Sequence, residues 1–91
     1  MHNCYLCHAP GAVAEYDESR RAIEVECRSS DCGDYVITQA AAGRIKATTP
    51  AEQLRLSRAA KDAAQCGLIL ELEVDERQGL TALAVTPRSR R

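Results

Sequence analysis

The stretch NCYLCHAP at residues 3–10 determines how the rest of this chain is interpreted, because it places two cysteines two residues apart. Together with the histidine that follows, Cys4, Cys7 and His8 form the pattern C-x-x-C-H, which attaches a c-type haem. Without the histidine, the pattern C-x-x-C indicates either a redox pair or one half of a zinc site. The remainder of the sequence has to decide among these three interpretations.

Two of these interpretations find little support elsewhere in the sequence. A haem normally needs a distant axial His or Met, but the only methionine is Met1 and the only other histidine is His2. A redox pair of the thioredoxin type follows a βαβ pattern, and no such pattern precedes Cys4. The zinc interpretation is therefore the one to follow.

A second pair of cysteines, Cys27 and Cys32, lies beyond an intervening segment of 19 residues, with four residues between its members. Two short-spaced pairs across a hairpin suit tetrahedral zinc, because each turn presents two sulfurs and strand pairing brings the turns together. Four sulfurs close the coordination sphere, so the expected ion is structural Zn²⁺ and not a catalytic one. The predicted ligands are Cys4, Cys7, Cys27 and Cys32.

The composition shows why such a fold needs a metal. The chain has 91 residues, three tyrosines and no phenylalanine or tryptophan, so it is poor in the side chains that bury most area. Zinc contributes on the order of 10 kcal/mol to small modules that otherwise lack a core. The sequence shows no signal-like apolar segment and no membrane-spanning run, which favours a cytoplasmic protein with reduced thiols. Disulfides or plain reduced cysteines are the alternative, and export would favour disulfides.

The segment CYLC…ECRSSDCGDYVIT resembles the zinc ribbon found at the start of many small bacterial and phage proteins. That pattern is C-x2-C, a hairpin, then C-x2–4-C-G-x-Y-x-I-T, and the resemblance covers about residues 3–40. It implies the same four cysteine ligands and a structural zinc ion. In this chain His8 follows Cys7 directly and the second pair has a four-residue spacer, so His8 remains an alternative to Cys32 as the fourth ligand. The second half resembles no family.

Alternation of apolar and polar residues predicts short strands in the first half. One strand places Ile23, Val25 and Cys27 on one side and Glu24 and Glu26 on the other. A short helix should follow at residues 39–47, with Thr38 as its cap. The expected strands are residues 12–17 and 22–27, joined by a polar connection, and residues 34–38.

A longer amphipathic helix should begin at Thr49, because Thr49, Pro50 and Glu52 form a capping box with proline at the first helical position. It should end near Cys66, with Gly67 as a left-handed stop. Cys66 should be a buried structural thiol, and Leu54 either lies under the ribbon or is exposed as a surface anchor. The apolar stripe comprises Leu56, Ala59, Ala60, Ala63 and Gly67. The opposite side carries Arg55, Arg58, Lys61, Asp62 and Gln65.

The chain should close with an antiparallel β-hairpin, because residues 68–75 alternate cleanly and residues 80–86 return after the turn ERQG. The predicted fold class is therefore α+β: N-terminal zinc-ribbon hairpins, a short helix, a longer amphipathic helix and a C-terminal antiparallel hairpin. We expect one small domain over residues 1–91. Its parts are a ribbon-like half (1–38), a helix-and-hairpin half (39–87) and a basic tail (88–91).

The residues outside the cysteine pairs do not form a catalytic set. Both histidines lie within the first eight residues, and the sequence contains neither a glycine-rich phosphate loop nor the H-x-E and P-C-x-x-C signature of zinc deaminases. The sequence therefore predicts a protein that is not an enzyme.

The formal net charge is −1, and four thiolates on one Zn²⁺ would bring it to about −3. This charge gives no general reason to expect a polyanion partner.

Two charged surfaces are candidates for binding. The hairpin carries Glu71, Glu73, Asp75 and Glu76, and the long helix carries Arg55, Arg58 and Lys61. Acidic strands repel phosphates, so an adaptor, regulator or inhibitor that contacts a protein is favoured over the alternative, a nucleic-acid-binding zinc-ribbon transcriptional regulator. A narrower hypothesis is a phage-encoded inhibitor of a bacterial defence system such as CRISPR. A second is that the acidic hairpin imitates nucleic acid toward a basic groove.

Overall fold

The computed structural model describes residues 3–27, 32–75, 77 and 79–85. The fold is α+β, with five strands and two helices, and each element lies within two residues of its predicted bounds. The predicted basic tail 88–91 lies outside the described residues. The elements are β1 (Val13–Asp17), β2 (Ala22–Glu26), β3 (Tyr35–Thr38), α1 (Gln39–Ile45), α2 (Pro50–Gln65), β4 (Ile69–Asp75) and β5 (Gly79–Val85).

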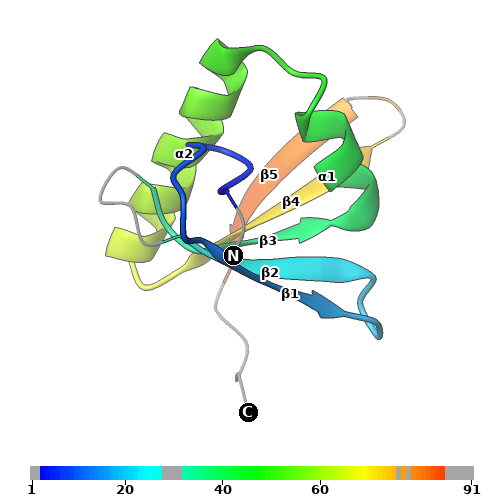
Figure 1. Ribbon diagram of the computed structural model, residues 1–91, viewed down its shortest axis with the longest axis horizontal. Helices are drawn as coiled ribbons and strands as arrows, with labels where there is room; N and C mark the ends of the chain where they lie inside the picture. The colour runs from blue at the N-terminus through cyan, green and yellow to red at the C-terminus, as the bar shows by residue number, and fades with distance from the viewer. Residues whose placement is uncertain (1–2, 28–31, 76, 78, 86–91) are drawn as a thin grey trace.

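All five strands form a single sheet in the order β1-β2-β3-β4-β5 (Figure 1). Neighbouring strands are antiparallel except for β3 and β4, which are parallel, with Tyr35 opposite Leu70 and Ile37 opposite Leu72. Parallel neighbours need a crossover connection, and α1 and α2 together supply it. The sequence predicted the two hairpins separately. The structure joins them through this parallel pair, so both halves of the chain share one sheet.

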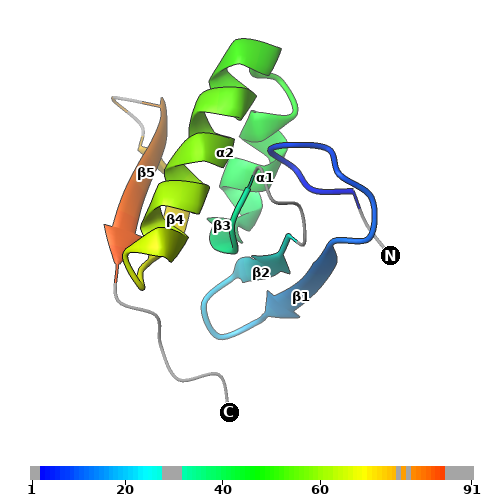
Figure 2. The same cartoon turned by 90° about the vertical axis from the view of Figure 1, so that its left-hand side faces the viewer.

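Both helices pack on one face of the sheet, as Figure 2 shows from the side. The alternation within β3 sends Tyr35 and Ile37 toward the helices, where they are fully buried. Ala60 and Ala63 of α2 are buried in the core on this face, and such small residues let helix and sheet approach closely. The main core comprises three cysteines together with Leu6, Ala12, Val25, Tyr35, Ile37, Ala41, Ala42, Ile45, Leu56, Ala60, Ala63, Leu70 and Leu72.

The opposite face of the sheet, which no helix of the described residues covers, carries a small apolar cluster surrounded by carboxylates. The strand register sets this pattern, because Val36 lies between Glu24 of β2 and Glu71 of β4. The cluster comprises Ala22, Val36 and Ile69, with Val85 packed against it. By strand alternation the same face carries Glu15, Asp17, Glu24, Glu26, Glu71, Glu73 and Asp75. We call this surface the acidic sheet face.

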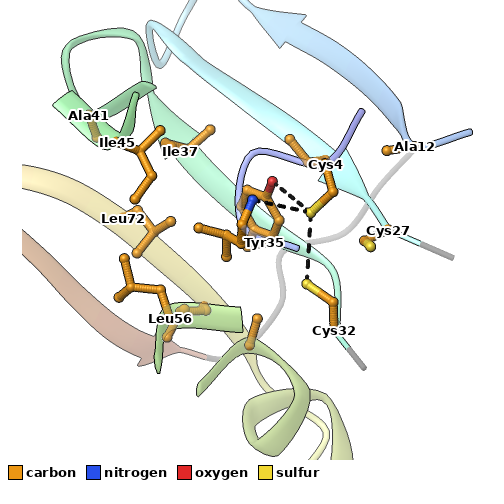
Figure 3. Close-up of a cluster of buried hydrophobic side chains, with 14 of the residues drawn as sticks. Cys4, Ala12, Cys27, Cys32, Tyr35, Ile37, Ala41, Ile45, Leu56 and Leu72 are labelled. Atoms are coloured by element: carbon orange, nitrogen blue, oxygen red, sulfur yellow. Dashed lines mark hydrogen bonds between the residues drawn. The ribbon is translucent and has the colours of Figure 1, made fainter. Parts of the chain in front are cut away.

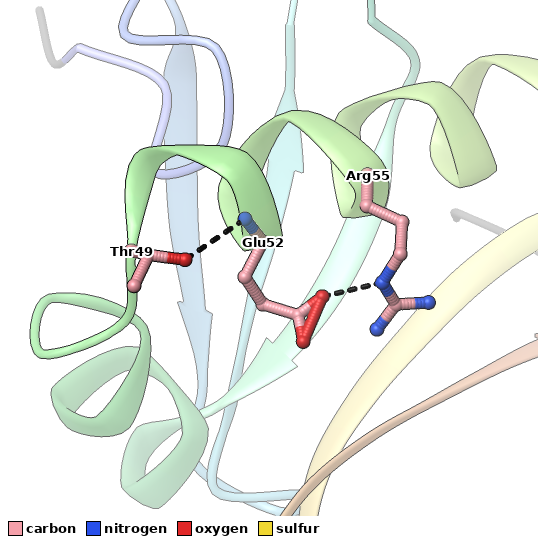
Figure 4. Close-up of polar contacts among 3 residues, drawn as sticks. All are labelled: Thr49, Glu52 and Arg55. Atoms are coloured by element: carbon pink, nitrogen blue, oxygen red, sulfur yellow. Dashed lines mark hydrogen bonds and ion pairs between the residues drawn. The ribbon is translucent and has the colours of Figure 1, made fainter.

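Both helix starts are capped as predicted. Thr38 Oγ1 accepts a hydrogen bond from the Ala41 amide at 3.1 Å, and Thr49 Oγ1 accepts one from the Glu52 amide at 3.2 Å. The second half of the predicted capping box does not form. The Glu52 carboxylate is engaged instead by the Nε atom of Arg55, one turn along the helix (Figure 4).

The end of α2 confirms Gly67 as the stop and corrects the prediction for Cys66. Gly67 has φ +75°, and the Leu68 amide donates to the Ala63 carbonyl at 2.8 Å, which closes a Schellman motif. Cys66 is the C-cap residue and is exposed, not buried. Among the described residues, no helix combines the length and apolarity needed to span a bilayer.

Candidate metal centre

Four cysteines converge at one end of the sheet, beside α2. Cys4 and Cys7 come from the loop before β1, Cys27 directly follows β2, and Cys32 lies shortly before β3. Figure 3 shows Cys4, Cys27 and Cys32 of this group. Their Sγ atoms all lie within 4.8 Å of one another. The predicted ligand set is therefore brought together, and it forms a group that can hold a metal ion. We call it the four-cysteine cluster.

The spacing of the sulfurs fits a tetrahedral ion. A metal–sulfur distance of about 2.3 Å, as in zinc sites, places tetrahedral sulfurs about 3.8 Å apart. The Sγ atoms of Cys4 and Cys32 are 3.8 Å apart, and those of Cys7 and Cys27 are 3.4 Å apart. Cys4, Cys27 and Cys32 are buried and Cys7 is partly exposed. The donor set is thus compact, all-sulfur and largely shielded from water.

The first cysteine turn is held by its own backbone. The His8 amide donates to the Cys4 carbonyl at 3.0 Å, and the Cys4 amide donates to the Ala9 carbonyl at 3.0 Å. Inside the turn, the Leu6 amide donates to Cys4 Sγ at 3.4 Å, a contact that favours the thiolate. His8 has φ +63°, the left-handed conformation that histidine adopts more readily than most non-glycine residues.

His8 is turned away from the cluster and bonds to α2. Its Nε2 atom lies 2.6 Å from Oε1 of Gln53, and Nε2 of the same amide donates to the Ile45 carbonyl at 2.9 Å. Because the Gln53 amide nitrogen is the donor toward Ile45, its oxygen accepts and His8 Nε2 carries the proton. This bond makes Nε2 unavailable to a metal. The group that can hold an ion contains Cys32 and not His8, so the geometry favours Cys32 for the fourth position.

Tyr35 holds Cys4 in place from the sheet. Its side chain is fully buried, and its hydroxyl oxygen lies 3.3 Å from Cys4 Sγ (Figure 3). The same oxygen accepts a hydrogen bond from the Tyr5 amide at 3.0 Å, so its own proton is free to point at the sulfur. Burial and the contact with Cys4 raise the pKa of Tyr35, which keeps it a donor. Such outer groups orient the ligands of a metal site.

Hydrogen bonds also change the pKa values of the cysteine thiols. The Cys32 thiol donates toward Cys4, which is the main reason that the pKa of Cys4 is lowered to about 4 despite burial. The same contact and burial raise the pKa of Cys32, while a hydrogen bond from the buried Ser57 of α2 acts in the opposite direction. The thiolate is therefore favoured at Cys4 and disfavoured at Cys32 as long as no cation is bound. A bound cation would replace the proton of Cys32, since metal binding releases the protons of its thiol ligands.

Gly33, which directly follows Cys32, allows the chain at this point to touch α2. A Cβ atom at this position would lie 2.5 Å from the carbonyl oxygen of Ala60 and 3.2 Å from the Cβ of Ala64. Gly33 is not among the glycines with positive φ, so a left-handed backbone conformation is not what requires glycine here. Glycine is required by the close approach of the chain to the helix backbone.

The predicted partner residues lie on two opposite sides of the molecule. Glu71, Glu73 and Asp75 belong to the acidic sheet face, where Glu71 pairs with Arg20 at 3.0 Å. Glu76 lies outside the described residues. The basic residues Arg55, Arg58 and Lys61 lie on α2, away from that face.

A groove of about 550 Å³ separates the first cysteine turn from the start of α2. Its lining includes Cys7, Arg58, Lys61 and the half-exposed Leu54, so Leu54 is on the surface and not under the ribbon.

Sequence reasoning missed the residues that surround the cluster. Tyr35 was part of the pattern C-G-x-Y, and its period-two relation to Gly33 along the strand was the available signal. Ser57 and Gln53 are buried polar residues of α2, and nothing in the helical pattern marked them.

Comparisons with family models, with curated proteins and with solved structures found no match for this chain.

Proposed function

We propose that this protein is a zinc-stabilised, non-enzymatic binding module that docks on a basic surface of another protein through its acidic sheet face. The observation that carries this proposal is the composition of that face. It is a sheet surface that no helix in the described part of the chain covers, with an apolar centre and carboxylates contributed by β1, β2 and β4. Such a surface offers charge complementarity to lysine and arginine side chains.

Zinc is the proposed occupant of the four-cysteine cluster. A tetrahedral all-sulfur set favours zinc or iron, and structural zinc is held by four cysteines in many small domains. The ion would link the N-terminal loop, the end of β2 and the approach to β3, and so supply folding free energy. Four thiolates leave no open coordination position, which supports a structural role and a protein that is not an enzyme. Reduced thiols suit the cytoplasm, where we place the protein.

The like charges on the acidic sheet face lower the stability of the fold when no partner is bound. Glu15 lies directly opposite Glu24 in the β1–β2 ladder, and like charges in such a pair destabilise a sheet. Near the centre, a hollow of about 200 Å³ is lined by Ala22, Val36, Glu71 and Glu73, and by Arg20, which pairs with Glu71. An arginine or lysine from a partner would lay its aliphatic stem on this apolar floor and its charge beside Glu73.

The alternative of nucleic-acid binding receives less support from the basic side of the molecule. Arg55 already pairs with Glu52. Arg58 and Lys61 share a groove with Cys7, and a cluster of four thiolates around Zn²⁺ carries a net charge of about −2. These cations therefore have a local counter-charge in the protein itself. A phosphate backbone would also meet the field of the acidic sheet face.

Metal analysis of the purified, reduced protein tests the first part of the proposal. We expect one zinc ion per chain, and circular dichroism should show loss of structure when a strong chelator removes it. Iron in the same site would be recognised by its absorption of visible light. A protein with no stoichiometric metal, or one that keeps its structure after chelation, would refute the zinc assignment. The separate proposal about the docking surface would be unaffected.

A matched pair of double variants tests the docking surface. The variant Glu73→Gln with Asp75→Asn neutralises two exposed carboxylates of the acidic sheet face. The control Glu52→Gln with Asp62→Asn removes the same charges from α2. Binding of a labelled peptide of alternating lysine and alanine should weaken severalfold in the first variant only, and should weaken with salt. The proposal that this is the docking surface would be refuted by equal effects in both variants, by no binding at low salt, or by tighter binding to mixed DNA or RNA.

A further inference from the structure

Strand β5 is an edge strand without the features that usually protect such an edge. Among the described strands it pairs with β4 alone, so its outer backbone groups face away from the sheet. Its sequence GLTALAV contains no charged residue and no proline. The other edge strand, β1, carries Glu15 and Asp17 within five residues. Charges, prolines and bulges are the usual protections of an edge strand.

The exposed part of β5 is regular and apolar. The ladder with β4 runs without a bulge from Ile69 opposite Val85 to Asp75 opposite Gly79. Ala82, Leu83 and Ala84 are exposed, and Leu83 keeps 66% of its surface accessible. A straight apolar edge of this length is a template on which another strand can add by backbone hydrogen bonds.

We infer that β5 pairs antiparallel with β5 of a second copy of this chain, so that two five-stranded sheets become one continuous sheet. In a register centred on Ala82, Leu83 of each copy lies opposite Thr81 of the other. No charged residue meets a like charge in this pairing. The interface is isologous, with the same strand contributed by both copies, which is the commonest symmetry of homodimers.

A second copy suits this edge better than an unrelated charged segment. With no charge along β5, the edge offers nothing that would select a basic or acidic peptide. An uncharged strand of equal length and complementary pattern is present in every other molecule of the same protein. Antiparallel pairing within a continuous sheet relates the copies by an axis perpendicular to the sheet, so both acidic sheet faces lie on the same side. The pairing itself does not depend on what those faces bind.

The carboxylates of β4 give the pairing a characteristic dependence on salt. Glu71 and Glu73 lie one strand inside the edge, so those of the two copies are separated by three strand spacings, about 14 Å. This separation exceeds the Debye length of about 8 Å at physiological ionic strength and is shorter than the length of about 30 Å at 0.01 M. Repulsion is therefore felt at low salt and screened at physiological salt. The fraction of dimer should rise with salt.

Sedimentation velocity of the zinc-loaded protein, from micromolar to millimolar concentration, tests the inference at low and physiological salt. We expect a monomer–dimer equilibrium that shifts toward dimer as salt is added. The double variant Thr81→Lys with Leu83→Lys would place lysines opposite one another in the dimer and should weaken it at least tenfold. The control Val13→Lys with Tyr16→Lys, at exposed positions of β1, should leave it unchanged.

Isotope-filtered NMR on a mixture of labelled and unlabelled protein provides a readout that does not rely on a variant. Methyl contacts between Leu83 of one copy and Thr81 of the other are expected. A protein that stays monomeric at physiological salt and millimolar concentration overturns the inference. So does a dimer that the two edge lysines leave intact. A dimer that salt weakens would point instead to contact between the acidic sheet face and the basic side of α2, and would also overturn it.

Discussion

Replacing Gly33 with alanine should separate the chain at Cys32 and Gly33 from α2. The new Cβ would lie 2.5 Å from the Ala60 carbonyl oxygen and 2.9 Å from its carbon, distances that real Cβ contacts do not reach. These are backbone atoms of a packed helix, so they cannot rotate away. Overpacking of this kind costs about 2 kcal/mol, which lowers Tm by about 10 °C in a chain of this size. Cys32 is the adjacent residue, so zinc affinity should fall as well.

The chain contains a matched control for this substitution. Gly43 lies inside α1 and a Cβ atom there meets no atom within 4 Å. Alanine in a helix interior is favoured over glycine by about 1 kcal/mol, so Gly43→Ala should raise Tm by about 5 °C. Thermal unfolding followed by circular dichroism, and competition with a chromophoric chelator, would measure stability and zinc affinity in both variants. If Gly33→Ala were as stable as the wild type with unchanged zinc affinity, the packing of Gly33 against Ala60 would not be what joins the cluster to α2.

Three further substitutions test the surroundings of the cluster. Tyr35→Phe removes the hydroxyl that reaches Cys4 and leaves the Tyr5 amide without its acceptor, so zinc affinity should fall about tenfold, whereas Tyr16→Phe at an exposed position should change nothing in the same chelator competition. Cys66→Ser should keep full zinc stoichiometry in metal analysis, because Cys66 is exposed and outside the cluster. Gln53→Ala should lower the unfolding free energy in urea by about 2 kcal/mol while zinc stoichiometry is retained, since it strips a buried carbonyl of its donor.

Local signals in the sequence were sufficient for the elements and for the ligand set. Thr38 and Thr49 cap helices through contacts within three residues, and Gly67 ends α2 through contacts within one turn. The spacing of the cysteines within each pair is also a local property. Because these features depend on short stretches of chain, a single sequence predicts them well.

Features that depend on distant residues were not predicted. The parallel pairing of β3 with β4 joins segments more than thirty residues apart, and each strand alternates in a way that antiparallel pairing would equally satisfy. The burial of Ser57 and Gln53 has the same cause, because only the position of the cysteine-bearing segments makes these polar side chains interior. The Nε2 atom of His8 could be excluded as a ligand only once Gln53 was known to lie beside it.

The position of the cluster explains how so few aromatic side chains suffice for this fold. A two-stranded hairpin such as β4–β5 is marginal by itself, and it needs both β3 alongside and α2 above it. The crossover from β3 to β4 is the longest connection in the sheet, and it carries both helices. Cys32 and Gly33 lie just before β3, and Gly33 packs against Ala60 in the middle of α2. An ion held by the cysteines would tie the N-terminal loop and the end of β2 to this segment, and so would fix the surface on which the returning α2 packs.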